Sequence, residues 1–215
     1  MSGSGAEPAG RPGRALRIGL TGPIGCGKST VGSWLATRGA FAIDADSVAR
    51  EVTSPGHEAH ERILERWGAT ATSADGSLDR AALARIVFDD ATQLAALEAI
   101  VHPAVRLRII ALMHEADRAG VPVIVVEAIK LVEGGLAAIC HEVWLVTCGA
   151  TTQRARMLAR GMPEDDADRR LAAQAGLAER LAPHATRTLD TSGPPEATAA
   201  KAHAMLQAAR GLDLV

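Results

Sequence analysis

Tyrosine and asparagine are both missing from this sequence, and aromatic residues make up only 2% of its 215 positions. Proteins that bind single-stranded nucleic acid normally stack the bases on aromatic side chains, so this scarcity argues against that class. Without asparagine, the Asn-Lys-x-Asp motif by which GTPases read guanine cannot be present. A net charge of -2 and a pI near 6.4 also disfavour a nucleic-acid partner, which usually requires a basic surface.

Long apolar runs and paired cysteines are missing as well. No run approaches the roughly 20 residues of a membrane helix, and the N-terminus lacks the apolar core of a secretory signal. The cysteines Cys26, Cys140 and Cys148 show no paired spacing, which favours reduced thiols. We therefore expect a cytoplasmic protein with no membrane partner, and we interpret Cys26 as a small residue in an unconstrained slot.

Apolar segments that alternate with helical patterns dominate the rest of the chain. Short strands are predicted at 16–20, 41–46, 121–128, 142–148 and within 185–193. The valine and isoleucine run at 121–128 does not alternate with polar residues, which is typical of an interior strand in a parallel sheet. Strands alternating with helices predict an α/β fold of three layers, with helices on both faces of a parallel sheet.

Three regions interrupt or extend this core. Residues 1–14 are rich in Gly, Pro, Ser and Ala, which predicts a disordered tail. Residues 57–119 are mostly helical and too long for a simple crossover, which predicts an inserted helical lobe with Pro103 at a helix start or a kink. Residues 151–175 form two arginine-rich helical pieces that we interpret as a lid. The predicted core comprises 15–56, 120–150 and 183–215.

The segment GPIGCGKST, which follows the first strand, matches the phosphate-binding loop pattern G-x-x-x-x-G-K-[ST]. Glycines let the backbone turn so that its N–H groups face a phosphate, and the following helix adds its positive end. Lys28 is predicted to reach the β- and γ-phosphates, and Ser29 to ligate Mg²⁺. The alternative is a glycine-rich turn that ends in Lys-Ser by chance. The predicted nucleotide-binding residues are Gly22, Gly25, Cys26, Gly27, Lys28, Ser29 and Thr30.

Acidic residues follow two of the predicted strands. Asp44 and Asp46 share one face if the strand at 41–46 persists, and one of them can accept a proton from a hydroxyl or hold a magnesium-bound water. The alternative is that Asp46 or Ser47 caps the next helix. Glu127 follows the 121–128 run and either reaches Mg²⁺ through water or has a structural role.

Cationic residues are spaced for a lid over a triphosphate. Arg156 and Arg160 are four positions apart, so one helix face presents both guanidinium groups. The alternative is a solvated helix face with charge partners at the same spacing. A lone histidine such as His102 is more often structural than catalytic.

Taken together, these motifs resemble the dephospho-coenzyme A kinase family over about residues 17 to 208. The resemblance is carried, in chain order, by GLTGPIGCGKSTV, IDADSVAREV, DGSLDRAALARIVF, LEAIVHPAV, RARMLARGM, EDDADRRLAAQ and LDTSG. The family transfers the γ-phosphate of ATP to the ribose 3′-hydroxyl of dephospho-coenzyme A. The resemblance implies that 57–119 is the acceptor-binding lobe, with a P-loop NTPase-type core and ATP with Mg²⁺ as cofactors.

The same resemblance assigns roles to individual residues. It implies that Asp46 is the catalytic base, that Arg156 and Arg160 are the lid arginines, and that His102 helps to shape the acceptor site. The turn from Asp190 to Gly193 corresponds to the segment that approaches adenine in the family.

One segment departs from the family pattern of an acid, a spacer and P-L-L-F-E. Here the aligned residues are EAIKLVE, with Ile129 at the proline position, Lys130 in place of a leucine, and Glu133 as the final acid. Lys130 extends either toward a phosphate of the acceptor or into solvent. Three alternatives remain open: another small-molecule kinase, such as a nucleoside monophosphate kinase, a nucleotide-dependent switch, and a degenerate coenzyme A-binding protein.

Overall fold

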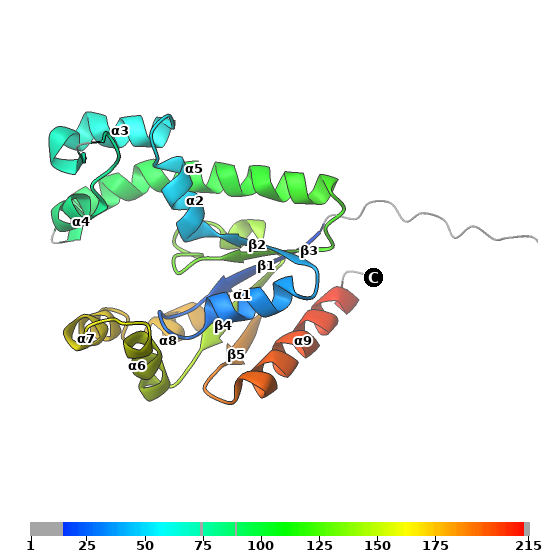
Figure 1. Cartoon of the computed structure of the whole chain (residues 1–215). Coiled ribbons are helices and arrows are strands. Elements are labelled where there is room, and N and C mark those ends of the chain that lie inside the picture. Colours follow the sequence, from blue (N-terminus) through cyan, green and yellow to red (C-terminus); the bar gives the residue numbers. More distant parts are fainter. Residues whose placement is uncertain (1–14, 74, 89, 213–215) are drawn as a thin grey trace, which may run out of the picture.

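The computed structural model describes residues 15–73, 75–88 and 90–212 (Figure 1). The predicted tail at 1–14 lies outside the described residues. Within them, no helix combines the length and the apolar character that crossing a membrane requires.

A five-stranded parallel sheet forms the centre of the molecule, in the order β2-β3-β1-β4-β5. This confirms the predicted parallel α/β fold. Both β1 and β3 have a neighbour on each side, and for β3 this agrees with its unbroken run of valine and isoleucine. The strands are β1 Leu16–Thr21, β2 Ala40–Asp44, β3 Val123–Glu127, β4 Glu142–Thr147 and β5 Arg187–Asp190.

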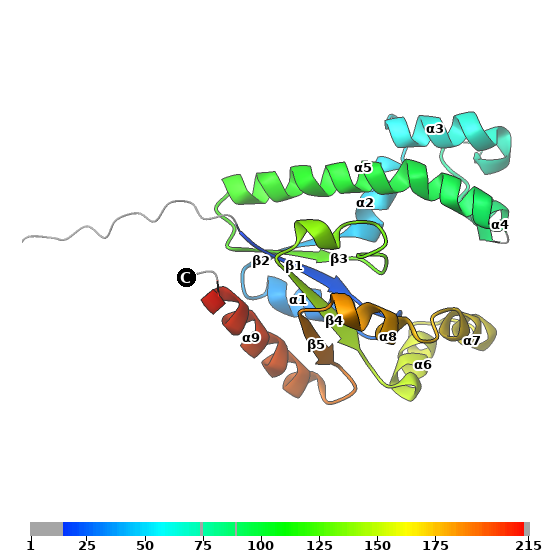
Figure 2. The same ribbon diagram turned by 180° about the vertical axis from the view of Figure 1, so that it is seen from behind.

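Helices cover both faces of the sheet, because alternate strand residues point to opposite sides. On one face, α1 (Lys28–Ala36) and α9 (Pro195–Leu212) bury Val31, Leu35 and Leu206 against the strands. On the other face lie α2 (Ala45–Val52), α5 (Ala91–Arg118) and the short α8 (Leu177–Leu181), which packs on β4 (Figure 2). This arrangement produces two apolar layers around one sheet.

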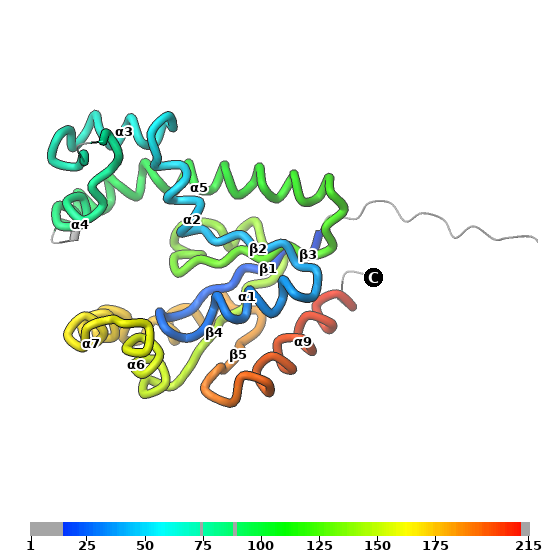
Figure 3. The backbone as a smooth tube through the Cα atoms, in the orientation of Figure 1, coloured from blue at the N-terminus to red at the C-terminus, as the bar shows by residue number. Residues whose placement is uncertain are grey.

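A helical lobe is inserted between β2 and β3, at the end of the sheet where the strands finish (Figure 3). It has its own apolar core, in which Ile63, Trp67 and Leu83 are buried against α5. Pro103 lies inside α5 rather than at a helix start. The other helical elements of the lobe are α3 Glu58–Trp67, η1 Gly68–Ala71 and α4 Arg80–Phe88.

A second helical projection, α6 (Ala150–Ala159) followed by α7 (Glu164–Ala173), extends from the same end of the sheet on the opposite side (Figure 3). A short 3-10 helix, η3 (Ala182–His184), precedes β5. The segment KLVEGGLAAIC at 130–140, whose pattern predicts a short helix, instead forms a series of turns that ends in the 3-10 helix η2 (Ala137–Ile139). The pair Gly134-Gly135 explains this difference, because glycine disfavours continuous helix.

A partly buried ion pair between Glu142 and Arg187 joins β4 to β5. Glu142 accepts hydrogen bonds from Arg187 at 2.7 and 2.8 Å and from Trp144 Nε1 at 2.5 Å. Burial alone raises the Glu142 pKa, but these hydrogen bonds outweigh it and hold the pKa below its ordinary value of 4.5. Glu142 therefore stabilises the fold above about pH 4.5, and this contribution is lost as the pH falls through its lowered pKa.

We expect Glu142→Gln to lower the free energy of unfolding by about 1–3 kcal/mol at pH 7, because it weakens the partner of a largely buried guanidinium. Urea unfolding of both proteins at pH 7 and at about pH 3 measures this difference. The difference in free energy of unfolding between the two proteins should be smaller at the lower pH, where the Glu142 carboxylate of the natural protein becomes protonated. An equal difference in unfolding free energy at both pH values would contradict the prediction.

Candidate functional site

The loop between β1 and α1 has the shape that the glycine motif predicts. Gly22 and Gly25 have φ angles of 137° and 77°, which side chains other than glycine rarely adopt. A Cβ on Gly22 would lie 2.1 Å from the Val146 carbonyl oxygen, so the loop passes directly against β4. A Cβ on Gly25 would lie 3.0 Å from the Gln153 carbonyl oxygen. Neighbouring elements therefore hold this loop closely on two sides.

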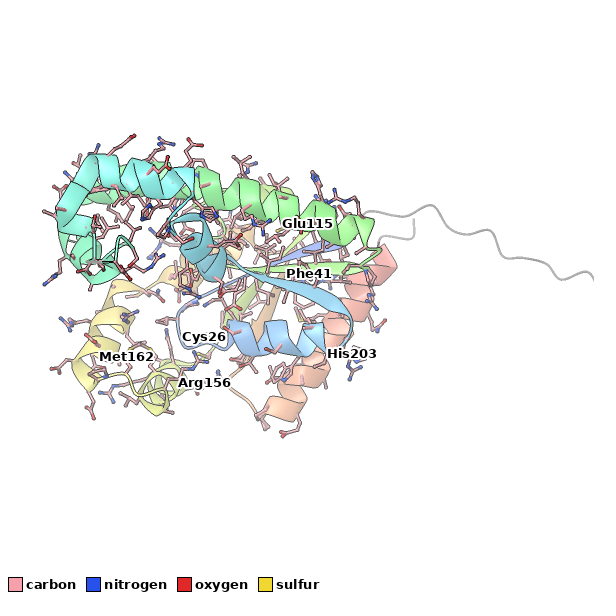
Figure 4. The ribbon with its side chains drawn as sticks, turned by 45° about the horizontal axis from the view of Figure 1, so that its top comes forward. Cys26, Phe41, Glu115, Arg156, Met162 and His203 are labelled. Carbon is pink, nitrogen blue, oxygen red and sulfur yellow. The ribbon has the colours of Figure 1, made fainter. Side chains whose placement is uncertain are left out.

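Cys26 is more constrained than predicted. Cys26 lies just before the start of α1 (Figure 4). Its side chain is fully buried in the core, and Cys148 packs against the same cluster. A hydrogen bond with Cys148 and burial both raise the pKa of the Cys26 thiol. The interpretation of this position as an unconstrained slot is therefore wrong, because the loop turns the side chain inward.

Lys28 begins α1 and is buried with its amino group at the loop. Its Nζ donates to the carbonyl oxygens of Gly22 at 2.9 Å and Pro23 at 3.1 Å. Burial lowers the Lys28 pKa, and the Glu127 carboxylate opposes that shift. The group faces a cavity of about 250 Å³, which we call the phosphate cavity. Its lining includes Gly27, Lys28, Ser29, Asp46, Glu127, Arg160 and Arg170.

Oxygen atoms of Ser29 and Glu127 meet in this cavity. Ser29 Oγ donates to Glu127 Oε1 at 2.8 Å, and Glu127 ends β3 directly beside Asp44 of β2. Burial raises the Glu127 pKa, opposed by the Ser29 hydrogen bond and by Lys28, and the Asp44 and Asp46 charges raise it further. A hydroxyl with a carboxylate fits Mg²⁺, which takes its remaining ligands from water and phosphate.

Asp46 lies in α2 and not on a strand. The strand β2 ends at Asp44, whose side chain caps α2 by accepting from the Asp46 N–H at 3.0 Å and from the Ser47 hydroxyl. The strand therefore does not persist to Asp46, so the condition under which Asp44 and Asp46 would share one strand face is not met. The alternative that Asp46 or Ser47 is the cap is wrong. Because Asp44 caps the helix, the exposed Asp46 carboxylate in its first turn is available to the site.

Asp46 also lines a second cavity, of about 300 Å³, which we call the lobe cavity. Most of its lining is apolar, and Asp46, His102 and Lys130 supply polar groups. A further cavity of about 280 Å³ continues toward α4 and shares His102 and Lys130 with it. Lys130 forms an ion pair with Glu98 of α5. The remaining residues of the lobe cavity are Ala45, Ala49, Val101, Val105, Ala128, Ile129, Gly134 and Leu136.

The two predicted lid arginines line a fourth cavity, of about 280 Å³, on the other side of the phosphate loop. Arg156 donates to Thr191 Oγ1 at 2.8 Å and to the Thr191 carbonyl oxygen at 2.7 Å. Arg160 is the residue that caps α6 at its C-terminus, not a member of the helix, and it lines both this cavity and the phosphate cavity. We call this space the base-side cavity. It also contacts Gly27, Thr30, Val31, Trp34, Thr191, Pro195 and Thr198.

In the turn from Asp190 to Gly193, which the family resemblance places near adenine, the residue that lines the base-side cavity is Thr191. Asp190 accepts from the Ser192 N–H at 2.8 Å and from its hydroxyl at 2.7 Å, forming a turn, while a Cβ on Gly193 would meet nothing within 4 Å. Neither is among the residues that line the base-side cavity, whereas Thr191 between them is. Sequence reasoning missed Thr191, although its place just after a strand end was a usable signal. The role predicted for Asp190 and Gly193 stays a prediction.

Comparison with known proteins gives consistent relatives. Residues 16–195 match the dephospho-CoA kinase family. A dephospho-CoA kinase of Symbiobacterium thermophilum is 44% identical over 195 residues, which cover 90% of this chain and 81% of the relative. A crystal structure of a Thermus thermophilus protein superimposes with a TM-score of 0.76 at 35% identity, over 91% of this chain and 98% of the other.

A dephospho-CoA kinase of Campylobacter jejuni superimposes with a TM-score of 0.59 at 21% identity, over 92% of this chain and 98% of the other, and shares the fold. The family match covers most of the chain, including the phosphate loop and both helical projections. The chain belongs to the dephospho-CoA kinase family.

Proposed function

We propose that this chain transfers the γ-phosphoryl group of ATP to the ribose 3′-hydroxyl of dephospho-coenzyme A, the last step of coenzyme A synthesis. The observation that carries the proposal is the position of Asp46, which lines both the phosphate cavity and the largely apolar lobe cavity. A base placed there can reach an acceptor hydroxyl in one cavity while the triphosphate occupies the other. In this proposal the enzyme acts in the cytoplasm.

Each polar group of the site has a role in this scheme. Asp46 accepts the proton of the attacking hydroxyl. Lys28, Arg156 and Arg160 stabilise the charge on the transferred phosphoryl group. Ser29 and Glu127 would hold Mg²⁺, which neutralises charge on the triphosphate when it is bound. The base-side cavity would take the adenine of ATP, between Trp34 of α1 and the segment around Thr191.

Lys130 is proposed to bind a phosphate of the acceptor. It lines the lobe cavity and the cavity beyond it, and its ion pair with Glu98 joins two partly exposed side chains. Such pairs contribute little to stability, so an anionic substrate can replace Glu98 as the partner. The apolar lining of the lobe cavity would then contact the uncharged part of the acceptor.

We expect Lys130→Leu to raise KM for dephospho-coenzyme A about three- to fivefold, with kcat and KM for ATP nearly unchanged. The reason is that an exposed cation–phosphate contact is lost while the base and the phosphate loop stay intact. Steady-state kinetics with each substrate varied in turn measures this, with Lys130→Arg as the matched control that retains the charge. An unchanged KM for dephospho-coenzyme A would mean that Lys130 extends into solvent and does not contact the acceptor.

The proposed reaction is tested by an ADP-release assay with ATP, Mg²⁺ and dephospho-coenzyme A, run beside AMP, CMP and no acceptor. We expect ADP release that depends on dephospho-coenzyme A, with coenzyme A as the product. Release only with AMP or CMP would identify a nucleoside monophosphate kinase and overturn the proposal. ATP binding without release for any acceptor would indicate a switch or a degenerate binder.

A further inference from the structure

Ile24, in the middle of the phosphate loop, has both of its backbone polar groups bonded by glutamine side chains from the lid. Its N–H donates to Gln174 Oε1 at 2.8 Å, and its carbonyl oxygen accepts from Gln153 Nε2 at 2.7 Å. Gln153 belongs to α6, and Gln174 caps the C-terminus of α7. A backbone N–H can only donate and a carbonyl can only accept, so the backbone determines which end of each amide faces it.

The residues that follow Ile24 in the loop are held from the same side. A Cβ on Gly25 would lie 3.0 Å from the Gln153 carbonyl oxygen and 3.1 Å from Met157 Cγ, so α6 packs against the loop backbone. Thr191, which receives the Arg156 guanidinium, donates its own hydroxyl to the Cys26 carbonyl oxygen at 2.8 Å. The lid therefore contacts Ile24 and Gly25 directly, and its Arg156 holds Thr191, which contacts Cys26.

The position of the Ile24 peptide matters for phosphate binding. Ile24 lines the phosphate cavity together with Lys28, and the Lys28 amino group donates to the two carbonyls just before Ile24. A rotation of the peptides around Ile24 would redirect both those carbonyls and the N–H groups that follow. The helix α6 carries Arg156, and Arg160 lies between α6 and α7. A contact between these helices and the phosphate loop therefore links the two arginines to the loop that would bind phosphate.

We propose that Gln153 and Gln174 are positioning residues that hold the Ile24 peptide and couple the α6–α7 lid to the phosphate loop. Both act through the loop and not on the substrate. The inference rests on the proposed function only in that the bound nucleotide is ATP.

Methionine and glutamate at each position provide the test. Methionine removes the hydrogen bond at similar length, so Gln174→Met and Gln153→Met should each weaken ATP binding about three- to tenfold. Glutamate has a different effect at the two positions. Gln174→Glu keeps an oxygen that accepts from the Ile24 N–H, whereas Gln153→Glu replaces the donor with an oxygen that faces the Ile24 carbonyl. We therefore expect the Gln174→Glu variant to bind ATP more tightly than Gln174→Met. At position 153 we expect the reverse, with Gln153→Glu binding ATP more weakly than Gln153→Met.

The measurements are the dissociation constant of ATP by calorimetry and the KM of each substrate. Added negative charge near a triphosphate lowers affinity at both positions, so charge alone cannot produce the reversal. Gln207→Glu, on an exposed position of α9, controls for charge elsewhere. KM for dephospho-coenzyme A should stay unchanged, which a general loosening of the fold would not produce.

Two results would overturn the inference. One is that all four variants bind ATP with the affinity of the natural protein. The other is that the glutamate variant binds ATP more weakly than the methionine variant at both positions. Thermal unfolding checks that each variant is folded. Gln153 is buried, and if its variants do not fold, the partly exposed Gln174 pair decides by itself. Because ATP binding is measured without an acceptor, a failure of the proposed reaction is distinguishable from a failure of this coupling.

Discussion

The Lys28→Ala enzyme is expected to turn over at least about 100-fold more slowly than the natural protein. Lys28 is buried at the phosphate loop with its ammonium facing the phosphate cavity, and it is held there by two loop carbonyls. A preorganised cation in such a site stabilises the charge of the transferred phosphoryl group, and alanine leaves that charge without a partner.

Steady-state kinetics with dephospho-coenzyme A measures the loss in kcat. Lys201→Ala removes the same charge from an exposed position on α9 and serves as the matched control, with activity expected to stay unchanged. If Lys28→Ala kept more than about a tenth of natural turnover, the electrostatic role of Lys28 in the transition state would be wrong.

Asp46→Asn is expected to lower kcat about 10²- to 10⁴-fold, with a modest change in KM for ATP. Asparagine keeps the shape of the side chain but cannot accept the proton of the acceptor hydroxyl. Because Asp46 is exposed in the first turn of α2 and does not cap the helix, the substitution should leave the fold intact.

The informative control for this substitution is Asp44→Asn, two residues away. Asp44 accepts the Asp46 N–H through Oδ1, and asparagine can still cap a helix in that way. This variant should therefore retain most of its turnover. Full turnover of Asp46→Asn, or equal losses in both variants, would contradict the assignment of Asp46 as the base.

Local sequence features were sufficient for the phosphate loop and the sheet. A tight loop that needs positive φ angles, followed by a helix, leaves a pattern within nine residues, and Gly22 and Gly25 adopt such angles here. Unbroken runs of valine and isoleucine indicate strands that are buried on both faces, and β3 is such a strand. Sequence patterns were less informative about where elements begin and end. The strand β2 ends two residues before its predicted end, so Asp46 lies in the helix α2.

The sequence by itself determined the kind of protein: a parallel α/β kinase fold with a phosphate loop and the motifs of one family. Only the tertiary structure decided which distant residues meet, because such contacts depend on how helices pack and not on local periodicity. It brought Gln174 to Ile24 across 150 residues and Arg156 to Thr191 across 35. It also paired Lys130 with Glu98 and placed Asp46 in two adjoining cavities, where packing of α2 and α5 on the sheet determines the geometry.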